Sequence, residues 1–194
     1  MDIQLPAQIE SERLILTVPL DPSFELAKEI YAEVDFSRKD LLKFLPWPKF
    51  TTRPEHYFLY LANSCEQGYN NGSKFAYVIR NKETGKFLGI VDLLKVDNVH
   101  KSAEIGYWLS SHATGNGYMT EAVRALEKAA FENGVNRIII RNATDNIPSA
   151  NVAKNAGYVL EGVMRQAHIA VDSDELLDTN LWSKLKSDWE KEQR

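Results

Sequence analysis

The spacing of apolar residues predicts a series of short helices in the first third of the chain. Over residues 24–34, apolar side chains recur every three or four positions, which is the period of an amphipathic helix. Asp21-Pro22, just before this stretch, is typical of a helix cap followed by proline in the first turn. The same period predicts two further helices, over residues 39–44 and 52–68.

Alternating and continuous apolar runs predict that the rest of the chain is rich in strands. Strands are expected over residues 13–18, 74–80, 87–96, 103–109 and 137–141, and a long closing hairpin over residues 158–171 and 175–183. Helices are expected over residues 118–131 and 146–157, with a short helix of mixed charge at 184–194. Helices and strands interleave, so we expect one α/β domain spanning residues 1–194.

Composition narrows the possible functions. The chain has 194 residues, 44% hydrophobic and 26% charged, with a net charge of -4, which argues against general nucleic-acid binding. Its single cysteine, Cys65, excludes a disulfide framework within the chain. The polar start is no secretory signal, and the longest apolar run is too short to span a bilayer. We therefore expect a cytoplasmic protein with no membrane partner. The four histidines lack the spacing of metal ligands, which argues against a metal site.

A glycine turn between a strand and a helix is the most informative feature of the sequence. Gly115 and Gly117 follow the strand at 103–109, and helical spacing begins at Tyr118. Such a turn directs unpaired backbone N–H groups and the positive end of a helix at one point, which suits a phosphate or pyrophosphate. The third glycine of the dinucleotide fingerprint is replaced by Thr120, so a nicotinamide-dinucleotide enzyme is disfavoured. A plain hairpin turn is the alternative, but it needs a following strand.

A second constellation opens the helix at 146–157. Asn146 is a good N-cap residue, and this structural interpretation accounts for it by itself. Ser149 and Asn151 also place polar side chains near the end of the preceding strand, where ligands bind in α/β sheets.

These motifs together resemble the GNAT acetyltransferases, in particular the branch that acetylates ribosomal-protein N-termini. The resemblance extends over nearly the whole chain, in order. It rests on Glu10-Ser-Glu-Arg-Leu14, Leu45-Pro-Trp47, Glu104-Ile-Gly-Tyr-Trp-Leu109, Gly115-x-Gly117-Tyr-Met-Thr120, Asn146-x-x-Ser149, Ala156-Gly157-Tyr158, Leu160-Glu-Gly162 and the segment 177–182.

The resemblance implies a fold and a cofactor site. It implies a mixed, mostly antiparallel, twisted sheet of about seven strands flanked by helices, with two strands splayed around acetyl-coenzyme A. The expected cofactor-binding residues are Leu109, Ser110, Thr114, Gly115, Asn116, Gly117, Tyr118, Met119, Thr120, Asn146 and Asn151. The family pattern has arginine or glutamine in place of Thr114 and a small residue in place of Met119. Arg124 and Lys154 are candidates for the 3′-phosphate.

Three side chains are candidates for proton transfer. The resemblance places Glu104 beneath the thioester as a base and Ser149 near the sulfur as a donor to the leaving thiolate. The third is His168, since a histidine side chain, unperturbed, titrates near pH 6.5 and could accept a proton at neutral pH. Each has a structural alternative: an ion-paired carboxylate, a hydroxyl in a first helical turn and a strand histidine.

The expected activity is acetyl transfer by direct attack of a primary amine, most favourably a protein α-amine of ribosomal-protein type. Two alternatives stay open: a small amine as acceptor, or a non-catalytic module that binds acyl-coenzyme A. No metal is expected, and the protein is expected to be a monomer or a homodimer.

Overall fold

The computed structural model describes residues 2–63, 68–171 and 173–194. Eight strands form one sheet in the order β1-β2-β3-β4-β5-β6-β8-β7, and every neighbouring pair is antiparallel except β5 and β6. The strands are β1 (Gln8–Glu10), β2 (Leu14–Thr17), β3 (Phe75–Asn81), β4 (Phe87–Asp97), β5 (Ser102–Leu109), β6 (Arg137–Ala143), β7 (Val159–Ile169) and β8 (Leu176–Leu185). The expected mixed, mostly antiparallel sheet is confirmed, with eight strands in place of about seven.

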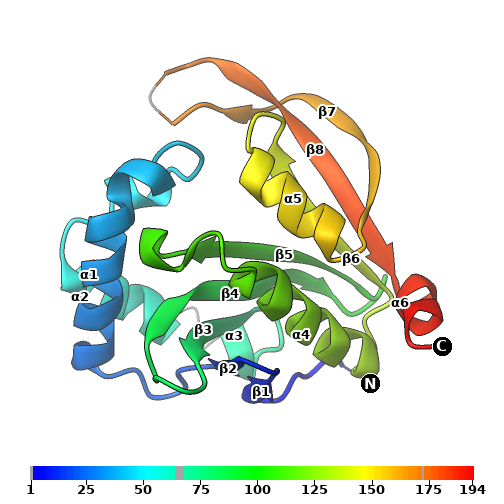
Figure 1. Ribbon diagram of the computed structural model, residues 1–194, viewed down its shortest axis with the longest axis horizontal. Helices are drawn as coiled ribbons and strands as arrows, with labels where there is room; N and C mark the ends of the chain where they lie inside the picture. The colour runs from blue at the N-terminus through cyan, green and yellow to red at the C-terminus, as the bar shows by residue number, and fades with distance from the viewer. Residues whose placement is uncertain (1, 64–67, 172) are drawn as a thin grey trace.

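Helices flank this sheet, as Figure 1 shows. They are α1 (Phe24–Leu41), α2 (Pro54–Tyr60), α3 (Gly68–Asn70), α4 (Tyr118–Glu132), α5 (Ile147–Asn155) and α6 (Lys186–Glu192), with 3-10 turns at η1 (Trp47–Lys49) and η3 (Ser111–Ala113). The buried faces of α1 and α4 join the sheet in one hydrophobic core that includes Ile30, Phe75 and Leu126. None of the helices in the described residues is long and apolar enough to cross a membrane.

Several boundaries differ from those predicted. Helix α1 continues unbroken to Leu41, so the prediction of a separate helix at residues 39–44 was wrong. The N-cap of α1 is Ser23, whose hydroxyl accepts from the amide of Leu26 at 3.1 Å. Strand β1 was missed because only its pairing with β2 marks it as a strand. Within the expected helix at 52–68, α2 begins at Pro54 and ends at Tyr60. Residues 64–67 of that expected helix, and Asp172, lie outside the described residues.

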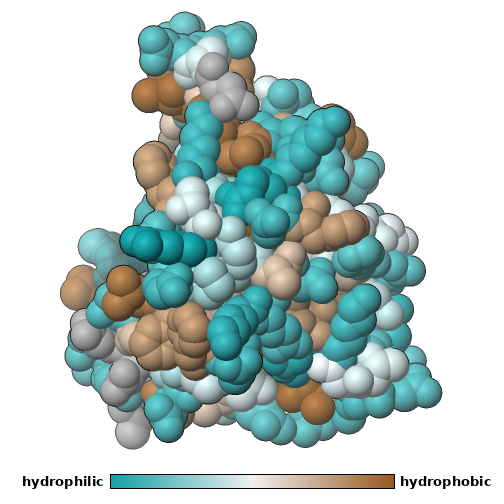
Figure 2. Space-filling view, turned by 90° about the vertical axis from the view of Figure 1, so that its left-hand side faces the viewer, coloured by the Kyte–Doolittle hydropathy of each residue, from teal (hydrophilic) through white to brown (hydrophobic). Residues whose placement is uncertain are grey.

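The sheet opens between β5 and β6. These parallel strands pair only through residues 102–104 and 137–139, although β5 continues to Leu109 and β6 to Ala143. Beyond that point the two strands diverge, with α5 and the β7–β8 hairpin on one side and α1 and α4 on the other (Figure 1). The expected pair of splayed strands is therefore confirmed. The tip of the hairpin stands clear of the body in Figure 2, where hydrophobic and hydrophilic residues are mixed over the visible face.

Candidate active site

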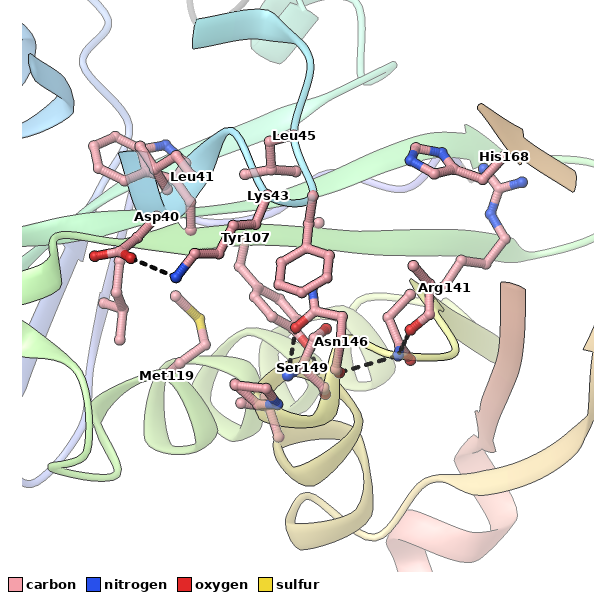
Figure 3. A pocket seen from close by; sticks show the side chains of 18 of the residues that line it. Asp40, Leu41, Lys43, Leu45, Tyr107, Met119, Arg141, Asn146, Ser149 and His168 are labelled. Carbon is pink, nitrogen blue, oxygen red and sulfur yellow. Dashed lines mark hydrogen bonds and ion pairs between the residues drawn. The ribbon is translucent and has the colours of Figure 1, made fainter. Parts of the chain in front are cut away.

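A cavity of about 770 Å³ lies where β5 and β6 separate. Its walls come from the end of α1, the second half of β5, the end of β6, the first turn of α5 and the β7–β8 hairpin. Figure 3 shows Met119 and the Asp40–Lys43 pair toward one side, Asn146 and Ser149 in the middle, and Arg141 and His168 toward the other side. The splayed strands therefore bring residues from five distant parts of the chain to one cavity.

The last residues of β5 present a free backbone edge to this gap. The amide of Ser110 donates to the carbonyl of Leu88 on β4 at 2.8 Å. Since the direction of backbone groups alternates along a strand, the amide of Leu109 points away from β4, toward the gap. Ser110 itself does not fit the role expected of it. Its carbonyl accepts from Ala113 at 2.8 Å, and with its amide also engaged it offers no backbone group to a ligand.

The loop between β5 and α4 forms a row of unpaired amides. Gly115 and Gly117 have φ of 79° and 75°, a left-handed conformation that favours glycine, and Gly117 is the N-cap of α4 without a side-chain cap. Within the described residues, the amides of residues 114–117 donate to no acceptor. Those of residues 118–120 lie in the first helical turn, which leaves them without helical partners. This arrangement suits an anion.

A polar cluster that sequence reasoning missed holds the far end of this loop. The Glu121 carboxylate accepts from the hydroxyl of Ser11 at 2.8 Å, and from the amide and the Nε of Arg13 at 2.8 and 2.7 Å. The guanidinium also donates to the carbonyl of Asn116 at 3.2 Å and lies 4.6 Å from the ring centre of Tyr118. Partial burial opposes ionisation of Glu121, but the hydrogen bonds from Arg13 and Ser11 outweigh it and lower its pKa. The Glu10-Ser-Glu-Arg-Leu14 motif is thus part of the loop's support.

Helix α5 places two of the expected residues in the cavity. The side chain of Asn146 caps the helix by accepting from the amide of Ser149 at 3.2 Å, and both residues line the cavity. The hydroxyl oxygens of Ser149 and Tyr107 lie 2.9 Å apart, and Tyr107 also donates to the Ser149 carbonyl at 3.1 Å. Burial raises the pKa of Tyr107 to about 12, against the opposing effect of the Ser149 hydrogen bond, so its proton is retained at neutral pH. Asn151 is exposed and lies outside the cavity lining, so its part in cofactor binding stays a prediction.

The remaining proton-transfer candidates differ in their surroundings. Glu104 accepts from Arg141 Nε at 3.0 Å and Nη2 at 2.9 Å, and from Lys95 at 2.9 Å, with its side chain 13% exposed. It lines the cavity, so the structure combines both interpretations of this residue, an ion-paired carboxylate and one that faces the site. His168 also lines the cavity from β7.

Some of the other expected residues line the cavity, and others are exposed beside it. Thr114 and Met119 line the cavity, whereas Gly115, Asn116 and Gly117 are exposed beside it. Arg124 donates to the carbonyl of Asn155 at 2.6 Å. In the parts of the chain that are described, no group of three or more His, Cys, Asp or Glu side chains is arranged to hold a metal ion.

The sequence profile of a family described as the acetyltransferase (GNAT) domain matches residues 13–159. The chain belongs to the GNAT acetyltransferase family. It is therefore an N-acetyltransferase, and the matched region runs from Arg13 through the amide-rich loop to the start of β7.

Individual relatives agree with this assignment. The chain is 26% identical, over 87% of its length and 96% of the relative's, to the ribosomal-protein-serine acetyltransferase of Escherichia coli strain K12. It is 26% identical to the microcin C7 self-immunity acetyltransferase MccE, solved with acetyl-CoA and AMP, with a TM-score of 0.82 over 90% of this chain and 93% of that one. The fold also matches the RimL ribosomal L7/L12 alpha-N-protein acetyltransferase, solved with coenzyme A, at 23% identity and a TM-score of 0.82, covering 93% and 97% of the two chains.

Proposed function

We propose that this GNAT enzyme transfers an acetyl group from acetyl-coenzyme A to the α-amine of a protein N-terminus of ribosomal-protein type. One observation carries the cofactor assignment: the unpaired amides of residues 114–120 lie beside a cavity that is also lined by the free edge of β5. A diphosphate suits the first feature and an extended amide-containing arm suits the second.

The residues present fit this co-substrate. The two left-handed glycines leave residues 115 and 117 of the loop without side chains, directly before the first turn of α4. Residues 114–120 would hold the diphosphate, and the Leu109 edge would pair with the pantetheine arm as an added strand. Asn146 and Ser149 line the path between β5 and β6 that the arm would follow. Acetyl-coenzyme A supplies an activated acyl group as its thioester.

The chain's own groups have distinct roles in the transfer. The Leu109 amide is placed to donate to the thioester oxygen as negative charge develops there. The hydroxyl of Ser149 donates a hydrogen bond to the leaving sulfur and keeps its own proton, and the released thiolate takes up a proton from solvent. Tyr107 keeps its proton for the Ser149 carbonyl, so the Ser149 hydroxyl can donate to Tyr107 when the sulfur is absent and to the sulfur when it is present.

The acceptor's own acidity decides how strong a base is needed. An α-amine with a pKa of about 7.7–8.0 is roughly a tenth or more neutral at pH 7, whereas a lysine side chain at about 10.4 is neutral only about once in 2,500 molecules. Glu104 already accepts three hydrogen bonds from cations, but only one of these reaches Oε1. That oxygen retains capacity to take a proton from the amine through water. Such a site suits an α-amine.

The relatives support the same acceptor. The Escherichia coli relative is named a ribosomal-protein-serine acetyltransferase, and RimL is described as an alpha-N-protein acetyltransferase. These names support a protein N-terminus, and the end of α1 and the β7–β8 hairpin both line the cavity where such a chain would bind.

An acceptor comparison tests the proposal. The full chain is mixed with acetyl-coenzyme A and one of three peptides: a free α-amine without lysine, the same peptide with a blocked N-terminus, and a blocked peptide with one lysine. Thiol release and a mass increase of one acetyl group are expected only with the free α-amine. Equal transfer to the blocked lysine peptide would refute the α-amine assignment. Cofactor binding without turnover on any amine would favour a non-catalytic binding module.

A further inference from the structure

Helix α1 meets the start of the amide-rich loop through a row of hydrogen bonds. Glu33, Ser37 and Asp40 are spaced four and three residues apart, so they lie on one face of the helix. The Ser110 hydroxyl donates to the Glu33 carboxylate, the Ser111 amide donates to the Ser37 hydroxyl at 2.8 Å, and the Ser111 hydroxyl donates to Asp40 Oδ2 at 2.9 Å. We call this row of three the α1 seam.

The α1 seam is buried at its centre and is directional. Ser37 and Ser110 are each 1% exposed. A buried amide left without an acceptor is costly, so the Ser37 hydroxyl fixes the position of the Ser111 backbone more tightly than apolar packing would. Ser110 and Ser111 follow Leu109 directly and precede the free amides of residues 114–117. The seam therefore holds the connection between the β5 edge and the cradle for the diphosphate.

The same helix also reaches the acceptor side of the cavity. Leu41, Asp40 and Lys43 line the cavity at the end of α1. The Asp40 carboxylate links both regions, because its Oδ1 accepts from Lys43 at 2.8 Å while its Oδ2 accepts from Ser111. A chain bound against Lys43 thus contacts the partner of Asp40, and Asp40 is bonded directly to the loop.

We infer that the α1 seam positions the β5–α4 connection and couples the acceptor wall to the acetyl-coenzyme A cradle, with Ser37 as its central positioning residue. This inference rests on the proposed function. Coupling of this kind is reciprocal: a bound acceptor raises the affinity for coenzyme A by the same factor as coenzyme A raises the affinity for the acceptor. Neither substrate needs to touch Ser37.

The test compares Ser37→Ala with the wild-type chain and a control on the same helix. Glu25→Gln is the control, since Glu25 is 81% exposed and pairs with Lys28 on the surface. Calorimetry measures the affinity for coenzyme A with and without the free-α-amine peptide. Hydrogen exchange of residues 111–117 is measured without ligand, and a thermal melt checks that each variant is folded.

The expected result is a three-part change confined to Ser37→Ala. Loss of one hydrogen bond from a buried amide should weaken coenzyme A binding about 3- to 10-fold, abolish the effect of the peptide on it, and speed exchange at residues 111–117. Glu25→Gln should match the wild type in all three. In a double-mutant cycle, the losses of coenzyme A affinity caused by Asp40→Ala and by Ser111→Ala should not be additive.

The outcomes separate this inference from the proposed function. Unchanged exchange at residues 111–117 in Ser37→Ala, or unchanged coenzyme A affinity and peptide effect, overturns the inference. A wild-type chain that gives no heat with coenzyme A overturns the proposed function instead, and the exchange measurement still decides whether the α1 seam holds the loop. Additive effects in the Asp40 and Ser111 cycle also count against the seam.

Discussion

Replacing Lys184 with methionine should destabilise the protein more than any surface change, because it breaks a buried ion pair that ties three elements together. The Lys184 ammonium donates to Glu127 on α4 at 2.8 Å, to the carbonyl of Ala156 after α5 at 2.8 Å, and to Glu192 on α6 at 2.7 Å. The Lys184 and Glu127 side chains are 1% and 3% exposed. Lys184→Met keeps the unbranched side chain except for its terminal ammonium, and leaves the carboxylate of Glu127 buried without its cation.

The magnitude follows from that burial. Removing one partner of a buried pair typically costs about 3–5 kcal/mol, because the other charge stays desolvated. A matched control on α4 is Lys128→Met, since Lys128 pairs with Glu132 at 2.6 Å but the two side chains are 59% and 46% exposed. That surface pair should contribute only about 0.3–0.5 kcal/mol. Urea denaturation at pH 7 should therefore separate the two variants by several kcal/mol of unfolding free energy.

The pH dependence gives an independent check on the cause. Burial raises the pKa of Glu127 to about 6, although Lys184 acts against this shift. A raised pKa means that Glu127 favours the folded state below its unfolded value of about 4.3 and that this contribution is lost as the pH rises through about 6. The Lys184→Met variant should therefore be closer to wild type at pH 5, where Glu127 takes up a proton, than at pH 7.

Two results would refute this reasoning. If Lys184→Met costs no more than Lys128→Met at pH 7, the buried pair does not stabilise the fold. If its cost is the same at pH 5 and pH 7, an unpaired Glu127 charge is not the cause. The double variant Lys184→Met/Glu127→Met should recover most of the loss, since apolar residues can replace a buried pair.

Three further predictions concern the site. Gly117→Ala and Gly85→Ala should each lose about 1–2 kcal/mol of stability in urea, since both residues are left-handed at φ 75° and 69°, but only Gly117→Ala should weaken coenzyme A binding in calorimetry. Ser149→Ala should lower kcat about 10- to 100-fold and leave the KM for acetyl-coenzyme A within about twofold; a rise in KM with no fall in kcat would exclude its role as hydrogen-bond donor to the leaving sulfur. Glu121→Gln should lower the melting temperature at pH 7. The carboxyl pKa is lowered in the fold, so this stabilisation is lost as the pH falls through the folded value, and the difference from wild type should shrink below about pH 4.

Local patterns were sufficient for most of the fold. The helical spacing from Tyr118 and the apolar runs of β3 to β6 predicted those elements to within a few residues, because their apolar faces pack directly on the core. The glycine turn was recognisable for the same reason, since its conformation depends on residues 115 and 117 themselves. Helix α1 and strand β1 were misjudged because packing of Leu41 and pairing with β2 decide their limits.

The supports of the site were out of reach of local patterns. Arg13 and Glu121 are 108 positions apart, and Tyr107 and Ser149 are 42 apart, so no spacing rule links either pair. Ser110 looked like a residue available to the cofactor, but its backbone groups are engaged with Leu88 and Ala113. Long-range hydrogen bonds therefore decide which of the motif residues remain free to act.

The geometry also explains how the proposed diphosphate site would work without a cation at residue 114. Thr114 contributes no charge, and its hydroxyl donates to the carbonyl of Ser111 at 3.0 Å. The guanidinium beside the loop, that of Arg13, is paired with Glu121 at 2.7 Å, so its charge is largely compensated. Attraction for the diphosphate must then come from backbone amides, whose dipoles act only at short range and in a fixed orientation. A site of this kind depends on how rigidly its loop is held, and the loop is held at its start by Ser37 and at its end by Arg13 and Glu121.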